Sequence, residues 1–96
     1  MTDQDFDKIS SYVGLAQRAG AVLYGEDAIE DKIKSAKIVL IDTEAPEKYT
    51  ARLQTKFSSL PLFRIEGLRK ALHRENVNAV AIVNENLAQA ILNILR

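Results

Sequence analysis

The sequence predicts an α/β protein, a three-layer αβα sandwich built on a four-stranded mixed sheet. Three observations support this fold class. The segment Ala36–Asp42 (AKIVLID) holds a continuous apolar run, which is typical of a strand buried on both faces of a sheet. A second run of this kind lies at Asn78–Val83. Helical patterns precede and follow the first run, at Gly25–Ser35 and Pro46–Ser59, so helices are available to cover both faces.

The first third of the chain predicts a helix, a strand and a second helix. Apolar residues recur at spacings of three and four from Phe6 onward, which predicts a helix over Asp3–Ala19 that Gly20 ends. The short apolar run Ala21–Tyr24 predicts the first strand. The tight turn at Gly25 then starts the second helix, whose first residues are acidic and complement the positive end of the helix dipole.

The rest of the chain continues the alternation of strand and helix. Pro46 suits a first helical turn, and Pro61 ends the helix that it opens. A third strand is predicted over Leu62–Ile65 and a short helix over Gly67–His73. Asn84 follows the fourth strand and is a good N-cap for the last helix.

Composition narrows the possible functions. The 96 residues predict one domain, residues 1–96. The chain has no cysteine and a single histidine, so a thiolate zinc site is excluded and no metal or other cofactor is expected. No apolar run is long enough to cross a bilayer, and the N-terminus is acidic where a signal peptide would be basic, so we expect a cytoplasmic protein.

Charge is balanced over the whole chain but unevenly distributed. Thirteen basic and thirteen acidic residues cancel, so net charge alone predicts no nucleic-acid partner. Residues 1–35 carry seven acids against four bases, whereas residues 36–96 carry nine bases against six acids. The densest basic group has no interleaved tyrosine or tryptophan that would stack on nucleotide bases. It comprises Arg64, Arg69, Lys70, His73 and Arg74.

Ligands of open α/β sheets bind at strand ends, in the loops that lead into helices. The loops to examine are therefore Tyr24–Asp27, Asp42–Pro46 and Val83–Asn86. Asp42 is a conceivable catalytic carboxylate, but the chain offers it no glycine-rich phosphate loop, no nucleophile elbow and no second carboxylate with a nearby histidine. The sequence therefore predicts a protein that is not an enzyme.

Several segments together resemble a known family. The run GLAQRAG from Gly14 to Gly20 is followed by the pair Gly25 and Glu26, then by the central strand, by the turn Ser59–Phe63 and by AVAIVNE starting at Ala79. This pattern is similar to the bacterial YlxQ-type branch of the ribosomal protein L-seven-Ae family, over nearly the whole chain. The resemblance implies an αβα fold and RNA binding without catalysis, in many members to kink-turns.

The resemblance also implies where RNA would bind. The family uses the loop and helix start after the first strand, which here is Gly25–Asp31, and the loop after the last strand. In the family this segment typically carries a glycine, an asparagine, a glutamate and a lysine. Gly25 matches the glycine, whereas Asp27, Ala28 and Asp31 stand where the other three are expected. The acidic residues of this segment would repel phosphates at the place where the family holds them.

Each candidate residue also has a structural interpretation. Gly25 either brings backbone N–H groups to a phosphate or only makes the turn, and Arg18 either contacts phosphate or caps the first helix. Lys32, Lys34 and Lys37 form either a basic edge or a solvated face. Asn84 and Glu85 cap the last helix and, by resemblance, also contact RNA. The predicted RNA-binding residues are Arg18, Gly25, Glu26, Asp27, Lys32, Lys34, Lys37, Asn84 and Glu85.

Two function hypotheses follow. The first is a ribosome-associated protein that binds structured RNA, ribosomal RNA included, through the Gly25 turn and the lysines of residues 32–37. The alternative is a protein-interaction module that keeps the fold and has lost the RNA site, because residues 26–31 are acidic and the net charge is zero. Convergence of the three lysines on Gly25 would favour RNA, and a carboxylate-dominated surface there would favour a protein partner.

Overall fold

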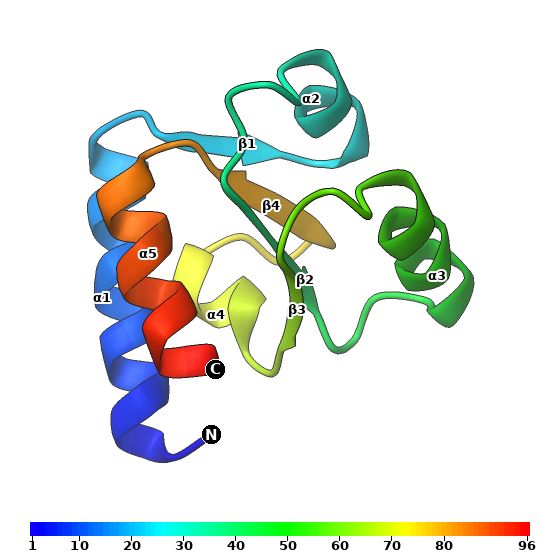
Figure 1. The fold of residues 1–96 in the computed structure, drawn as a ribbon. Coiled ribbons are helices and arrows are strands. Elements are labelled where there is room, and N and C mark those ends of the chain that lie inside the picture. Colours follow the sequence, from blue (N-terminus) through cyan, green and yellow to red (C-terminus); the bar gives the residue numbers. More distant parts are fainter.

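The computed structural model describes residues 1–96 and contains the predicted order of helices and strands (Figure 1). It is an α/β fold in which helices flank a four-stranded mixed sheet. The elements are α1 (Asp3–Arg18), β1 (Val22–Tyr24), α2 (Glu26–Asp31), β2 (Ile38–Asp42), α3 (Glu47–Lys56), β3 (Leu62–Ile65), α4 (Leu68–Leu72), β4 (Ala79–Ile82) and α5 (Glu85–Leu95).

The strand order in the sheet is β1-β4-β2-β3. Strand β4 lies between β1 and β2 and is antiparallel to both, whereas β2 and β3 are parallel. In this register Val39 of β2 lies between Leu62 of β3 and Ala81 of β4. Because β1, β2 and β3 share one direction, their carboxyl ends lie at the same end of the sheet as the beginning of β4.

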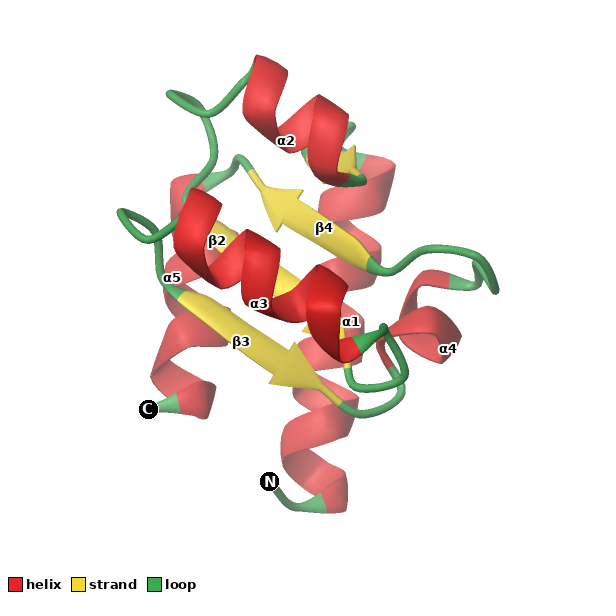
Figure 2. Cartoon of the chain, turned by 90° about the vertical axis from the view of Figure 1, so that its right-hand side faces the viewer, coloured by secondary structure: helices red, strands yellow, loops and turns green.

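The central strand separates two hydrophobic cores, as its continuous apolar run predicts. All five residues of β2 are buried. Ile38 and Leu40 face a core shared with α1, α4 and α5, whereas Val39 and Ile41 face a core shared with α2 and α3. Figure 2 shows α2 and α3 in front of the sheet and the other three helices behind it. Both faces of the central strand are therefore covered by helices.

The helix starts follow the expected capping chemistry at two places. Thr2 and Asp5 form a reciprocal capping box at α1, in which the Thr2 hydroxyl accepts from the Asp5 N–H at 3.1 Å. Asn84 caps α5 by accepting from the Leu87 N–H at 2.9 Å. The local sequence is sufficient to place both helix starts, because each cap lies within three residues of its partner.

Helix α2 is shorter than the sequence predicts. The pattern indicates a helix to Ser35, but α2 ends at Asp31, and Lys32–Ser35 form a turn in which the Ser35 N–H donates to the Lys32 carbonyl. Strand β2 begins at Ile38, so the chain has only six residues after α2 in which to return to the sheet. Lys32 and Lys34 therefore lie in a turn and not on a helix.

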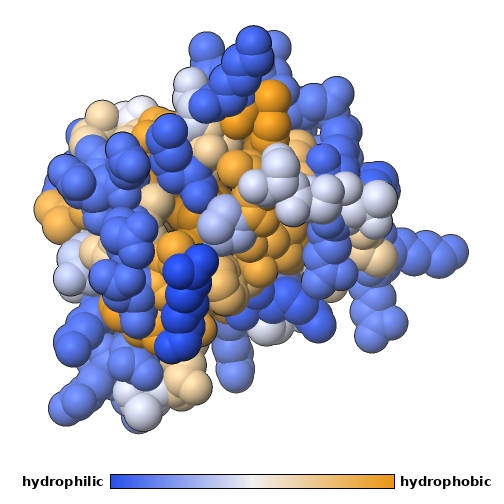
Figure 3. All heavy atoms as spheres, in the orientation of Figure 1, coloured by the Kyte–Doolittle hydropathy of each residue, from blue (hydrophilic) through white to orange (hydrophobic).

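No helix is both long and apolar enough to span a membrane. The face seen in Figure 3 is mostly hydrophilic, with hydrophobic residues gathered near its centre between α5 and α3. Strand β3 forms the edge of the sheet on this side, and its Leu62 and Phe63 are only partly buried.

Candidate functional site

Three loops meet at the end of the sheet where β1, β2 and β3 terminate. They are Tyr24–Asp27, Asp42–Pro46 and the segment Arg74–Asn78, which precedes β4. Backbone hydrogen bonds join them: the Gly25 N–H donates to the Ala79 carbonyl, and the Asp42 N–H donates to the Asn78 carbonyl, each at 2.9 Å. The predicted loop Val83–Asn86 lies at the opposite end, because β4 is antiparallel to its neighbours.

Gly25 occupies a backbone conformation that only glycine adopts readily. Its φ and ψ are 87° and 165°, in a region essentially closed to residues with a Cβ. A Cβ placed there would meet no atom within 4 Å, so the surrounding space is open and only the backbone requires glycine. The turn is therefore partly exposed and has open space beside it at the start of α2.

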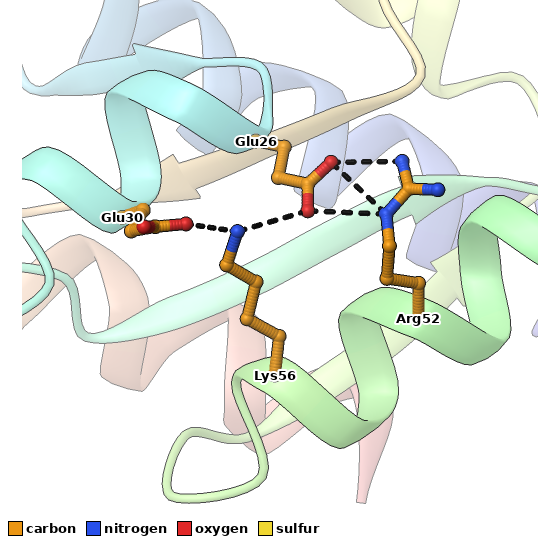
Figure 4. A network of polar contacts seen from close by, with 4 residues as sticks. All are labelled: Glu26, Glu30, Arg52 and Lys56. Carbon is orange, nitrogen blue, oxygen red and sulfur yellow. Dashed lines mark hydrogen bonds and ion pairs between the residues drawn. The ribbon is translucent and has the colours of Figure 1, made fainter.

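The acidic side chains of α2 are partly neutralised by α3 (Figure 4). Arg52 donates to both Glu26 carboxylate oxygens, at 2.8 to 3.2 Å, and Lys56 Nζ lies 3.1 Å from Glu26 Oε2. Lys56 also pairs with Glu30. Hydrogen bonds from Arg52 and then from Lys56 lower the pKa of Glu26 below its ordinary range. These two carboxylates are consequently less repulsive to phosphate than the sequence indicates.

Asp27 and Asp31 remain as acidic groups at this helix. Both are exposed, and neither belongs to any of the ion pairs in the structure.

The Glu26 charge also acts on Tyr49 of α3. Burial raises the pKa of the Tyr49 phenol, and the negative charge of Glu26 adds to that rise. The surface beside Gly25 thus combines a neutralised ion-pair network with two uncompensated carboxylates.

Arg74 stacks on the ring of Tyr24, the residue just before Gly25. The Arg74 guanidinium lies 4.1 Å from the centre of the Tyr24 ring, within the range of a cation–π contact. The amide of Gln17 in α1 donates to the Tyr24 hydroxyl at 3.2 Å and to the Leu72 carbonyl at 2.9 Å. Gln17 therefore ties α1 to β1 and α4, and holds the tyrosine that carries Arg74.

Asp42 has a structural role. It is 1% exposed, and its two oxygens accept the N–H groups of Glu44, at 2.7 Å, and of Arg69, at 2.9 Å. The second bond satisfies a free N–H in the first turn of α4, whose own N-cap Gly67 has no side chain to do so. Asp42 thus acts as a helix cap supplied by another element of the fold.

The basic group that the sequence showed is largely used internally. The Arg69 guanidinium donates to the Val77 carbonyl at 3.1 Å and to the Asn78 side chain at 2.6 Å, and pairs with Glu44 at 3.3 Å. It thereby fastens the segment before β4 to α4. Arg64 donates to the Thr43 carbonyl at 3.1 Å. The other four basic side chains share a hollow of about 740 Å³ with four carboxylates, Asp42, Glu44, Glu66 and Glu75. This hollow has mixed charge and no net preference for an anion.

The structure brings together some of the predicted site residues and separates others. Gly25, Glu26 and Asp27 lie at the end of the sheet just described. Lys32 and Lys34 follow α2, whose six residues span about 9 Å, in the turn toward the opposite end. Two further predicted residues, Lys37 and Glu85, line one hollow at that opposite end, next to Asn84, so the three lysines do not converge on Gly25. Arg18 ends α1 and lines a separate hollow with His73 of α4.

The sequence interpretation missed the residues that surround Gly25 in space. The sequence pattern did not single out Arg52 or Lys56, and it placed Arg74 in a basic group without an interleaved tyrosine or tryptophan. Tyr24 supplies the missing ring from 50 positions earlier in the chain. One feature of the predicted fold could have indicated this grouping, namely the mixed sheet. If the last strand is antiparallel to the others, the loop that precedes that strand lies at the same end of the sheet as Gly25.

The chemistry of this end of the sheet is that of polar recognition. No group of three or more histidine, cysteine or carboxylate side chains is arranged to hold a metal ion. What the site offers is a glycine turn with open space beside it, a guanidinium stacked on an aromatic ring and an ion-pair network. Guanidinium groups and backbone N–H groups are the protein groups that commonly contact nucleic-acid phosphates.

Comparison with known proteins identifies similar folds. No protein-family model matches the chain, and no curated protein is similar enough in sequence to match. Among solved structures, a protein of unknown function from Bacillus halodurans has a TM-score of 0.81 at 18% identity, over 91% of this chain and 95% of that one. The Giardia lamblia 15.5kD RNA binding protein has a TM-score of 0.76 at 15% identity, over 99% of this chain and 88% of its own. At these identities the likeness establishes a shared fold: the α/β arrangement of this chain is also that of an RNA-binding protein.

Proposed function

We propose that this protein binds structured RNA, ribosomal RNA included, and works without catalysis. The observation that carries the proposal is the Gly25 turn, where a conformation reserved for glycine leaves open space beside the start of α2. The open space above it leaves room for a sugar–phosphate backbone to approach. The shared fold with an RNA binding protein supports the same function.

Positive charge for this contact comes from Arg74. It lies on the ring of Tyr24, the residue just before Gly25, so its guanidinium is held in place before RNA arrives. A guanidinium on an aromatic ring also offers a flat outer face on which an unpaired base can stack. Glu26 takes part as the residue that keeps Arg52 beside the turn.

The other predicted residues extend this surface. An RNA lying along α2 from Gly25 would reach the turn that carries Lys32 and Lys34. A longer RNA would continue to Lys37, Asn84 and Glu85 at the opposite end of the sheet. We therefore expect the contribution of these residues to grow with the length of the RNA, and the contribution of Gly25 to be independent of it.

The experiment is a titration of a labelled kink-turn RNA, beside a duplex of the same length, at two salt concentrations. We expect the wild-type protein to prefer the kink-turn and Gly25→Asp to lose that preference. The matched control is Gly20→Asp, because Gly20 also has a positive φ of 68° and no atom within 4 Å of a Cβ, but lies before β1 at the other end of the sheet. Both variants add the same charge at a glycine with a positive φ.

Three results are possible in this titration. Loss of binding in Gly25→Asp but not in Gly20→Asp supports the proposal. Equal, weak binding of both RNAs that disappears with salt indicates only a generic basic surface. A flat titration at low salt contradicts RNA binding. The protein-interaction alternative would then gain, and the uncompensated carboxylates of Asp27 and Asp31 are the feature that favours it.

A further inference from the structure

A second surface hollow has features of a phosphate site. It measures about 470 Å³ and lies between the carboxyl-terminal half of α1 and the end of α4. Its polar lining consists of two hydroxyl groups, one amide, one guanidinium and one imidazole. These belong to Ser10, Ser11, Gln17, Arg18 and His73.

This hollow is lined by one guanidinium and by no carboxylate, whereas each of the other three hollows includes at least one carboxylate. The 740 Å³ hollow contains four carboxylates, and the two smaller ones contain Asp3 with Glu66 and Glu85, respectively. Arg18 is exposed and takes part in none of the ion pairs in the structure. An anion entering the hollow would meet an unpaired guanidinium and two hydroxyl donors, which are suitable ligands for phosphate oxygens.

Gly14 provides an independent argument. It lies inside α1, where glycine costs about 0.5–1 kcal/mol relative to alanine. The fold does not require glycine there, because a Cβ would meet only the Arg18 Nη1 atom, at an ordinary contact distance of 3.6 Å. The missing side chain instead leaves the floor of the hollow free beside the guanidinium. This space is what a bound group would use.

The hollow is connected to the Gly25 turn. Gln17 lines it and also donates to the hydroxyl of Tyr24, the residue just before Gly25. His73 lines it and immediately precedes Arg74, which stacks on the same tyrosine. A polyanion held at the turn would therefore have a second anchoring point nearby, on the α1 side of Tyr24.

We infer that this hollow binds a phosphate group, with Arg18 as its main ligand and Ser10, Ser11 and His73 as further contacts. In the RNA complex proposed above, on which this part rests, the group is a backbone phosphate of the RNA held at Gly25. The same chemistry would also accept a phosphate on a small molecule, and the test separates the two sources.

The first measurement is an NMR titration of the ¹⁵N-labelled protein with inorganic phosphate, against chloride at equal ionic strength. We expect the amide signals of residues 10–18 and of His73 to shift with phosphate only. Arg18→Gln should abolish the shifts, and so should Gly14→Gln, which fills the floor without changing charge. Lys8→Gln is the matched control, because Lys8 is an exposed cation of the same helix that does not line the hollow.

The second measurement is the salt dependence of RNA affinity. Loss of one phosphate contact should reduce the slope of log K against log salt by about 0.7–0.9 in Arg18→Gln, and leave it unchanged in Lys8→Gln. RNA binding with an unaltered slope in Arg18→Gln overturns the RNA phosphate contact, while the proposed function stands. Phosphate shifts in a protein that binds no RNA overturn the proposed function and support a small phosphorylated ligand. Absence of phosphate-specific shifts in the wild type overturns the site.

Discussion

Replacement of Asp42 tests whether a buried carboxylate holds α4 in place. In Asp42→Ala, the N–H groups of Glu44 and Arg69 lose their acceptors in a position that is 1% exposed. A hydrogen bond to a charged group contributes about 1.5–3 kcal/mol, so two such bonds predict a loss of about 3–6 kcal/mol of unfolding free energy. That is a large part of the 5–15 kcal/mol that is ordinary for a small domain.

A milder variant keeps this prediction measurable. Asp42→Asn retains the shape and one acceptor oxygen, but turns an NH₂ group toward one of the two N–H donors. We expect it to cost about 2 kcal/mol. Thr43→Ala is the matched control, since the Thr43 side chain is exposed and makes no hydrogen bond, and its effect should stay within about 0.5 kcal/mol.

The assay is equilibrium unfolding in urea, followed by circular dichroism. With a slope of about 1.5 kcal/mol per molar urea, Asp42→Ala should lower the midpoint by about 2–4 M and Asp42→Asn by about 1.3 M. An Asp42→Ala protein within about 1 kcal/mol of wild type would refute the reasoning. In that case, water or a relaxed backbone would satisfy the two N–H donors, and the Asp42 carboxylate would not be what holds α4 in place.

Three further predictions concern the residues around Gly25. The carboxyl of Glu26 should titrate, by NMR, below the ordinary glutamate pKa of about 4.3, and Arg52→Gln or Lys56→Gln should move its midpoint upward. Because this pKa is lowered in the folded state, ionised Glu26 stabilises the fold at neutral pH, and this contribution is lost as pH falls through the lowered value. Acid unfolding should therefore show a smaller loss of stability from this group in Arg52→Gln than in the wild type. Gly25→Ala should cost about 1–3 kcal/mol in urea unfolding, through backbone strain alone, and an unchanged midpoint would contradict the glycine-only turn. Gln17→Ala should cost about 1–2 kcal/mol by the loss of two hydrogen bonds, and wild-type stability would show that the tie between helices is dispensable.

The local pattern of the sequence determined the elements and the layers of this protein. The apolar run of Ala36–Asp42 was enough to predict a strand covered on both sides, because burial on both faces removes the polar alternation of an exposed strand. The caps Thr2 and Asn84 were equally readable, since each interaction spans three residues. The spacing of apolar residues and the helix caps depend only on residues close together in the sequence, so both can be recognised before the fold is known.

Only the tertiary structure decided which charges meet. Glu26 and Arg52 are 26 positions apart, and no local pattern links them; they meet because α2 and α3 cover the same face of the sheet. The same holds for Tyr24 and Arg74, which the sheet order brings together. An acidic segment and an isolated basic cluster in the sequence thus become paired groups in the fold.

The direction of β4 decided the shape of the candidate site. Sequence reasoning grouped the loops after the strands, whereas an antiparallel β4 sends Val83–Asn86 to the far end and brings Arg74–Asn78 to Gly25. Strand direction depends on the packing of the connecting helices against the sheet, which the apolar pattern of a strand does not record. The residues of the site were visible in the sequence, but their grouping depended on long-range contacts that form only on folding.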